Sequence, residues 1–333
     1  MSASSTTLTA RVPERDNAAI VEVTGASTRS SRLLDLSGRA VLFATDGSAS
    51  ALAGAHVAQE LARKYHAVIY VVTVVDTRGA AVPPPLDLAL AMGDATVGTD
   101  IHAEQAEAVR AGLTGAIGEA VQWPVRVRLG TPAAAIVKEA QRVGAVLIIM
   151  GLRRHGRLDR AVHDETTLNV VRRASCPVLG VTEETHGLPT RMLVAMDFSQ
   201  ASVIATSTAQ SIAGENPLVV LAYVARPSTP SLEEGESMIH ELGVGAAFAH
   251  VEKDLRKEGT TFDHIVLHHA IERTTAESIL DYADEVRCDL VAAGSVRRGR
   301  LDRWRMGSVS RDLVRDGRRS VLIAPPARDP ADQ

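Results

Sequence analysis

A stretch rich in glycine and arginine near the C-terminus holds the residue types best suited to binding an anion. It runs from Gly294, directly after the apolar segment 288–293, to Gly307 and Ser308, which open a predicted helix. A helix N-terminus carries a partial positive charge and unpaired N–H groups, so a glycine and a hydroxyl there suit a phosphate group. The stretch therefore predicts a phosphate site built from a loop and a helix start.

The same stretch occurs earlier in the chain. Gly151 stands where Gly294 stands, and the segment Gly-Arg-Leu-Asp-Arg occurs at both 156–160 and 299–303 without a gap in the alignment. The chain is therefore an internal duplication, and each feature of one copy can be compared with its counterpart in the other.

The two copies differ where the predicted helix begins. Asp164 and Glu165 replace Gly307 and Ser308 in the first copy. A carboxylate about 4 Å from a phosphate charge costs on the order of 4 kcal/mol at an effective dielectric near 20, unless it is compensated. Arg154 could compensate by pairing with Asp164, which would place a built-in anion inside the first site. We therefore expect the first site to be empty of ligand.

An aspartate follows the first predicted strand of each copy. Asp46 comes after the apolar segment 39–45, and Asp197 comes after 191–196. Ligands of open parallel sheets gather at the carboxyl ends of the strands, which favours a ligand role. An aspartate at this position could also simply cap the next helix, so both interpretations stay open.

Short apolar segments alternate with helical patterns in both halves. Strands are expected at 39–45, 67–75, 125–129, 145–150, 177–181, 191–196, 218–224, 264–267, 290–293 and 320–324. Helices are expected at 50–64, with Ser48 or Ser50 as N-cap, at 100–121, 166–174 and 233–257, and from Ser199 through Ala213. Two more are expected after the N-cap Thr131 and after a capping box formed by Thr274 and Glu277. This alternation predicts an α/β protein with two doubly wound domains, each with a five-stranded parallel sheet covered on both faces.

Composition excludes several classes of protein. The 333 residues suffice for two domains of about 140 residues each. The net charge of −4 makes the arginine loops local features, so no nucleic-acid partner is expected. Cys176 and Cys288 lack the spacing of metal ligands, which favours two buried thiols over a disulfide or a zinc site. No apolar run approaches the ~18 residues of a membrane span, so we expect a cytoplasmic protein without a membrane partner.

These residues together resemble the universal stress protein family, as a tandem member of it. The resemblance implies one domain at 38–183 and a second at 190–326, joined by a linker at 184–189, with tails at 1–37 and 327–333. The first tail is expected to be mobile because it is rich in Ser, Thr and Arg. The resemblance also implies the adenine nucleotide alpha hydrolase-like fold and a nucleotide-binding role in stress response or regulation.

The resemblance assigns the adenine end of a bound ATP to the loop after the first strand. Asp46 and Asp197 match the aspartate that meets adenine in nucleotide-binding members of the family. Thr45 and Met196 match the residue just before it.

The resemblance assigns the phosphates to the glycine loop. Gly151 and Gly294 match the first glycine of the family pattern Gly-x2-Gly-x9-Gly-Ser/Thr. Gly307, Ser308 and Val309 match its final Gly-Ser-Val, which the second copy alone retains. ATP, with or without Mg²⁺, is therefore expected mainly in the second domain.

Both copies depart from the family pattern at its second glycine. Arg154 and Arg297 occupy this position. A guanidinium can hold phosphate oxygens through two hydrogen bonds, but a side chain there can also block the approach of a phosphate to the backbone. The last strand of the first copy, which begins Cys176-Pro-Val-Leu, follows the family pattern.

The expected role is binding and not catalysis. No general base is evident, and the Walker pattern Gly-x4-Gly-Lys-Ser/Thr is absent, so any ATP hydrolysis would be slow and incidental. An alternative is an interaction scaffold that has lost both nucleotide sites and presents loops 77–99 and 226–236 to partners. A phosphoacceptor receiver with Asp46 as acceptor is excluded, because a second acidic cluster and the required lysine are missing.

Duplication also predicts how the halves assemble. The exposed edge of each last strand invites pairing, so the two halves are expected to mimic a homodimer through these strands. Whether whole chains also form a homodimer stays open.

Overall fold

The structure is a computed structural model that describes residues 34–76, 95–152, 164–225, 234–256, 259–268, 273–295 and 306–326. The first half contains β1 (Ala40–Ala44), α1 (Ala49–Tyr65), β2 (Val68–Val75), α3 (Ala95–Ile117), β3 (Val125–Leu129), α4 (Pro132–Val143), β4 (Leu147–Gly151), α5 (Asp164–Arg173) and β5 (Val178–Val181). The second half contains β6 (Arg191–Ala195), α6 (Gln200–Ser211), β7 (Leu218–Ala225), α7 (Glu234–Leu255), β8 (Thr261–His268), α8 (Thr275–Glu285), β9 (Leu290–Gly294), α9 (Ser308–Asp316) and β10 (Ser320–Ala324). The predicted order of elements is confirmed in both halves.

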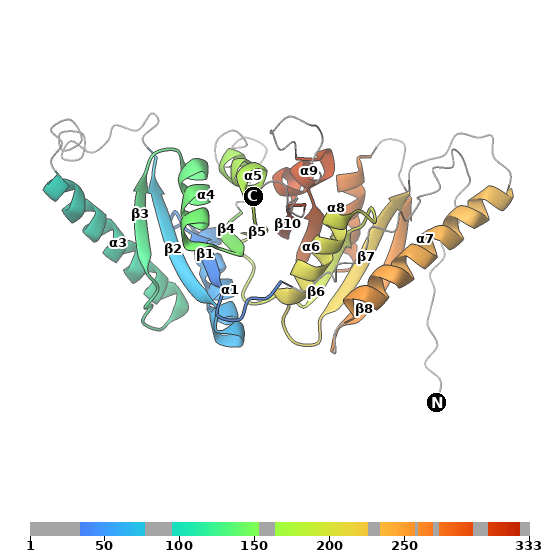
Figure 1. Cartoon of the computed structure of the whole chain (residues 1–333), viewed down its shortest axis with the longest axis horizontal. Helices are drawn as coiled ribbons and strands as arrows, with labels where there is room; N and C mark the ends of the chain where they lie inside the picture. Colours follow the sequence, from blue (N-terminus) through green and yellow to red (C-terminus); the bar gives the residue numbers. More distant parts are fainter. Residues whose placement is uncertain are drawn as a thin grey trace.

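All ten strands form one sheet in the order β3-β2-β1-β4-β5-β10-β9-β6-β7-β8 (Figure 1). Neighbouring strands are parallel within each half, and β5 and β10 pair antiparallel across the junction. Leu322 lies opposite Leu179, at the centre of three paired positions. The predicted α/β class and the pairing of the halves through their last strands are therefore confirmed.

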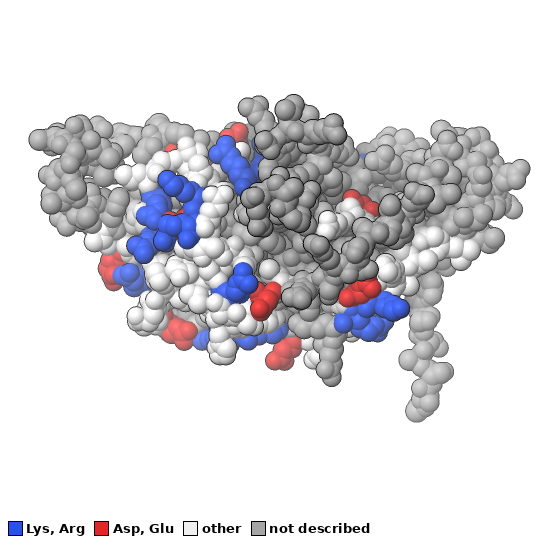
Figure 2. All heavy atoms as spheres, in the orientation of Figure 1, with Lys and Arg blue, Asp and Glu red and all other residues white. Residues whose placement is uncertain are grey.

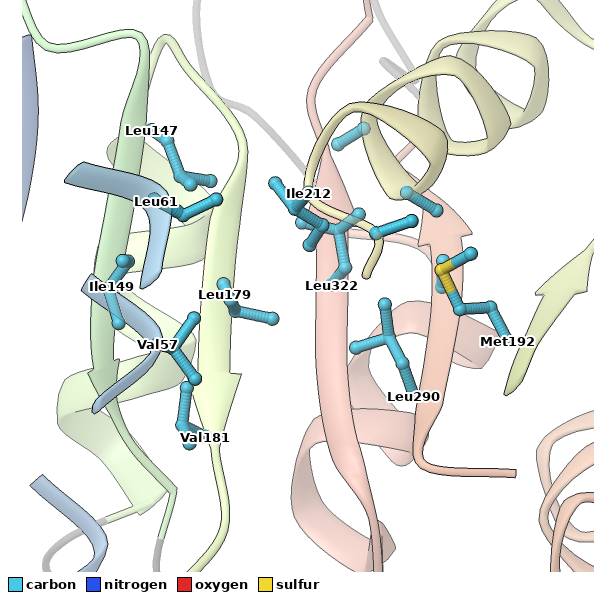
Figure 3. Packing of buried hydrophobic residues seen from close by; sticks show 14 of the residues in the cluster. Val57, Leu61, Leu147, Ile149, Leu179, Val181, Met192, Ile212, Leu290 and Leu322 are labelled. Atoms are coloured by element: carbon cyan, nitrogen blue, oxygen red, sulfur yellow. The ribbon is translucent and has the colours of Figure 1, made fainter. Parts of the chain in front are cut away.

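Two helical layers cover the sheet, and each buries a core that continues across the junction. Side chains of α1, α3, α6 and α7 pack with one set of alternate strand residues, which includes Val41 and Phe43. Side chains of α4, α5, α8 and α9 pack with the other set, which includes Leu42 and Ala44. Figure 3 shows Leu179 and Leu322 on the two strands that meet at the junction. None of the helices in the described ranges has the length and hydrophobicity needed to span a bilayer.

Packing at the junction differs between the two copies at one pair of positions. The first half has Leu152 and Gly180, where the second has Ser295 and Ile323. A Cβ on Gly180 would lie 3.3 Å from the Cβ of Leu152, which is itself buried. The large side chain therefore comes from the loop after β4 in the first half and from the last strand in the second. Leu152 occupies the space that a larger side chain at position 180 would need.

Polar contacts also cross the junction. The Lys64 ammonium donates to the carbonyls of Ala213 and Gly214, at 2.7 and 3.1 Å. These carbonyls follow the C-terminal end of α6, where a positive charge is favourable. The Ser320 hydroxyl accepts the backbone N–H of Thr182 at 3.1 Å. The halves are thus joined by backbone pairing, shared cores and charge-assisted contacts.

Predicted helix boundaries shift where local capping decides them. α3 spans 95–117 instead of the expected 100–121, and it ends before Gly118, whose φ of 77° suits a left-handed helix end. α5 begins at Asp164, two residues earlier than expected, so the acidic pair lies inside the first helical turn. The capping box at Thr274 and Glu277 is confirmed, with both reciprocal hydrogen bonds present.

Three further expectations are wrong in extent. β8 pairs with β7 over eight positions, where only residues 264–267 were expected, because exposed polar side chains on this edge strand hide its alternation. The mobile tail cannot extend to residue 37, because Leu36 is only 1% exposed and belongs to the core. The loops expected at 77–99 and 226–236 are too long, because residues 95–99 belong to α3 and residues 234–236 to α7. The rest of both segments lies outside the described residues.

Because side chains at positions 152 and 180 compete for the same space, a double-mutant cycle should show coupling between them. Gly180→Ile should destabilise the protein by about 1–3 kcal/mol through overpacking against Leu152. Leu152→Ala alone should cost about 2–5 kcal/mol through a cavity. The double variant should cost less than the sum of the two by at least about 1 kcal/mol, measured by urea unfolding. Gly180→Ile combined with Ile279→Ala on α8 should be additive, and an additive Leu152 pair would contradict the competition for space.

Candidate functional site

The aspartate loops and the glycine loops meet at the same edge of the sheet. Ala44 lies opposite Met150 in the β1–β4 pair, and Ala195 lies opposite Ala293 in the β6–β9 pair. The next residues of these strands lead directly into the loops after β1 and β4, and after β6 and β9. This register brings each aspartate loop and the first glycine of its partner loop, Gly151 or Gly294, to neighbouring strand ends. Residues 153–163 and 296–305 of the glycine loops lie outside the described residues.

The two aspartates stabilise a turn and do not cap a helix. Asp46 Oδ1 accepts the backbone N–H of Ser48 at 2.9 Å, and Asp197 Oδ1 accepts that of Ser199 at 3.0 Å. The serine hydroxyls are the N-caps of α1 and α6. Both aspartates are exposed, and each holds its turn through Oδ1.

Thr45 and Met196, the residues before the aspartates, are buried and already engaged. The Thr45 hydroxyl accepts the N–H of Gly47 at 3.1 Å, and the Met196 sulfur accepts the hydroxyl of Ser202 at 3.2 Å. Their side chains are 6% and 4% exposed. Any contact of these residues with a ligand therefore falls to their backbone groups.

A left-handed residue follows the aspartate in both halves. Gly47 has a φ of 77°, and Phe198 has a φ of 58°. A bulky side chain is disfavoured in this region by roughly 1–2 kcal/mol. The Phe198 ring packs against Tyr223 and Phe248, with centroids 5.6 and 5.1 Å away, which offsets that cost. Sequence reasoning missed this anchor of the Asp197 loop, although the alignment of Phe198 with a glycine was a usable signal.

The first glycine of each loop is required by packing. A Cβ on Gly151 would lie 2.7 Å from the backbone nitrogen of Ala51, and a Cβ on Gly294 would lie 2.6 Å from the carbonyl oxygen of Ala201. Such distances force the backbone to shift. These glycines therefore let a strand end approach the first turn of α1 or α6, whether or not a ligand binds.

Gly307 is different, because nothing described in the structure requires a glycine there. It is the N-cap of α9, with an ordinary extended backbone (φ −61°, ψ 156°). No described atom lies within 4 Å of an added Cβ. Ser, Thr, Asp or Asn would cap the helix better, so this glycine leaves the first N–H groups of α9 without a side-chain cap. Ser308 is exposed and Val309 half-buried at the start of the same helix.

Ser310 ties the start of α9 to the glycine loop. Its buried hydroxyl donates to the carbonyl of Gly294 at 2.9 Å. Sequence reasoning missed this contact, although a buried hydroxyl also stands at the equivalent Thr167. The contact fixes the helix start beside the end of β9.

The first turn of α5 contains two acidic residues, whereas α9 begins without a side-chain cap. Asp164 is the first residue of α5, and Glu165, which is exposed, follows it in the first turn. Acidic residues are electrostatically favourable at this end of a helix. Arg154 and Arg297 lie outside the described residues, and the pairing of Arg154 with Asp164 stays a prediction.

A cavity of about 560 Å³ lies elsewhere, where the linker meets α1 and β5 of the first half and residues 284–290 and 318–320 of the second. Its two arginines, Arg318 and Arg319, both donate to Asp284, at 3.1 and 3.0 Å. Glu184, Asp284 and Asp289 all line the cavity, so its carboxylates outnumber its two arginines, and the strand edge is the better candidate for an anion site. Within the described ranges, no group of His, Cys, Asp or Glu is placed to hold a metal ion.

The two kinds of glycine give a paired stability prediction. Gly294→Ala should lower the free energy of unfolding by at least about 2 kcal/mol, because its Cβ meets the backbone of α6. Gly307→Ala should change it by less than about 1 kcal/mol, the usual effect of exchanging these residues at an N-cap. Denaturant titration of both variants checks this. A large loss of stability in Gly307→Ala would show that the fold itself needs this glycine.

Two solved structures match this chain over both halves, and a third matches 44% of it. A universal stress protein from Archaeoglobus fulgidus DSM 4304 is 16% identical, with a TM-score of 0.62 and coverage of 90% of this chain and 100% of that one. A functionally unknown protein from Pseudomonas aeruginosa PAO1 is 15% identical, with a TM-score of 0.54 and coverage of 90% and 95%. A universal stress protein in complex with cAMP is 23% identical over 44% of this chain and 98% of its own, with a TM-score of 0.29.

A comparison with curated proteins finds no match. The universal stress protein family model, in contrast, matches twice, at residues 38–182 and 189–325. These matches cover most of the chain and repeat the duplication seen in the sheet. The chain therefore belongs to the universal stress protein family.

Proposed function

We propose that the second half binds ATP at the edge formed by the Asp197 loop and the start of α9. The observation that carries this proposal is Gly307, a glycine that neither backbone conformation nor described packing requires. A ligand that approaches the backbone closely is a physical reason for glycine at such a position. The uncapped N–H groups of α9 and the Ser308 hydroxyl would then receive the phosphates, with Gly294 and Val309 alongside.

The adenine end would lie at the Asp197 loop. Asp197 is exposed beside the end of β9, and its turn is held by Ser199 and by the packing of Phe198. Met196 would contribute its backbone, because its side chain is buried. Arg297 is proposed to reach the phosphates through its guanidinium. Mg²⁺, where present, would accompany the nucleotide only as its counterion.

The first half would serve as the structural partner. Thr45, Asp46, Gly151 and Arg154 occupy the equivalent positions, but α5 begins with two acidic residues. The negative charge of a phosphate would be repelled there. Gly151 is explained by packing alone, so its presence is no sign of a functional site.

The proposed role is sensing or regulation in a stress response and not catalysis. Asp197 already accepts a hydrogen bond from its own turn, and the sequence lacks the Walker lysine pattern. Bound nucleotide would instead stabilise the start of α9 in a form that protein partners recognise. This gives binding, not turnover, as the measured property.

Calorimetric titration of the whole protein should give one equivalent of ATP. Gly307→Asp should abolish binding, because a carboxylate near the phosphates costs on the order of 4 kcal/mol. Asp197→Ala should also abolish it. Asp46→Ala is the matched control and should leave binding unchanged. The reverse pattern would place ATP in the first half, and no binding at all would favour the scaffold alternative.

The first site should be recoverable. Changing Asp164 to Gly and Glu165 to Ser removes the repulsive charges, supplies the missing helix start and frees Arg154. One restored charge-assisted contact is worth about 1.5–3 kcal/mol, so first-site affinity should rise at least about tenfold. The titration should then show two equivalents of ATP. A double variant that still binds one would indicate that Arg154 obstructs the pocket, and would count against Arg297 as a phosphate ligand.

A further inference from the structure

A buried carboxylate on α4 holds two arginines on the outer face of the first half. The Glu139 side chain is 2% exposed. Arg128, from β3, donates Nε and Nη2 to Glu139 Oε2 at 3.0 and 2.7 Å. Arg142, one helical turn later, donates Nε and Nη2 to Glu139 Oε1 at 2.9 and 2.6 Å. Each carboxylate oxygen therefore fixes one guanidinium plane.

The two guanidinium groups keep donors for a ligand. A guanidinium has five N–H donors, and Glu139 takes two from each arginine. Arg128 gives one more to the carbonyl of Val127. The side chains are 37% and 47% exposed, so the remaining donors are open to solvent.

The surrounding surface is basic. Arg126 is exposed and lies on the same side of β3 as Arg128, because alternate strand residues share a face. Three arginines and one glutamate give this group a net charge of +2. Figure 2 shows a gathering of basic atoms around a small acidic area over the region of β3 and α4. The group therefore presents a local positive field and fixed donors.

The duplicated half shows that the fold does not need this cluster. The positions of Glu139 and Arg142 are taken by Tyr282 and Glu285 in α8, which packs on the sheet in the same way. Replacing a buried ion cluster by well-packed residues is often neutral or stabilising. Stability alone therefore gives no reason for a buried Glu139 with two arginines.

We propose that Arg128 and Arg142, oriented by Glu139, form a binding site for a dianionic phosphate monoester group. Planar guanidinium forks bind phosphate oxygens in pairs, and fixed planes lose less conformational freedom on binding. The net charge of the cluster with Arg126 matches that of the dianion. The site is independent of the proposed ATP site, and its ligand can be a free phosphate compound or a phosphorylated protein segment.

Calorimetry on the full chain tests the proposal, with Gly307→Asp present throughout to keep the proposed ATP site closed. The probes are inorganic phosphate, an alanine-rich peptide with one phosphoserine, and the same peptide unphosphorylated. One saturable equivalent is expected with a phosphorylated probe and none with the plain peptide. Equal affinity for both phosphorylated probes would identify a free phosphate compound as the ligand class, and preference for the peptide would identify a protein segment.

Substitutions distinguish a specific phosphate site from nonspecific electrostatic attraction of phosphate to the surface. Arg142→Gln should weaken phosphate binding at least about tenfold, the loss expected for charge-assisted contacts. Arg142→Lys keeps a charge beside Glu139, and therefore the fold, but lacks the fork, so it should also weaken binding. Arg63→Gln is the matched control, because Arg63 is exposed and paired with Glu60 and Glu119. Equal loss in the control, full binding by Arg142→Lys, or no saturable binding by either phosphorylated probe would overturn the proposal.

Discussion

The antiparallel pairing of β5 with β10 is the contact on which the rest of the molecule depends. It joins two five-stranded sheets into one, and it lets both hydrophobic cores run across the junction. It also brings α5 and α9 into contact, so the two helices that begin at the glycine loops pack against each other (Figure 1). The ligand proposed at the start of α9 would therefore be positioned by the junction as well as by its own half.

Covalent duplication allows the halves to diverge while they remain paired. In the core, the two halves differ in which position carries the large side chain. The first half has Leu152 and Gly180, and the second has Ser295 and Ile323 at the same two positions. At the surface, the two halves differ in charge. α5 begins with two acidic residues, whereas α9 has Gly307 as its N-cap. One copy can thus lose its anion site and still supply the sheet edge that the other copy needs.

Much of the fold was predictable from sequence, because strand length, capping residues and the internal repeat are local signals. The loop pairing was also predictable, since strand ends of a parallel sheet share an edge. The sequence alone could not show that Gly294 and Gly307 occupy the loop for different reasons. Gly294 is required by its close contact with the backbone of α6, whereas no described contact requires Gly307. The Arg128 and Glu139 contact joins a strand to a helix, so no sequence period marks it.

The two helix starts, at Asp164 and Gly307, are proposed to be unequal as anion sites. Hydrogen exchange of the whole protein, with and without saturating ATP, tests this inequality most directly, because exchange reports each helix start separately. Bound ATP should slow exchange at residues 307–311 and 197–199 and leave residues 164–168 unchanged. Protection at 164–168, or an absence of protection at 307–311 when ATP is bound, would contradict the proposed inequality.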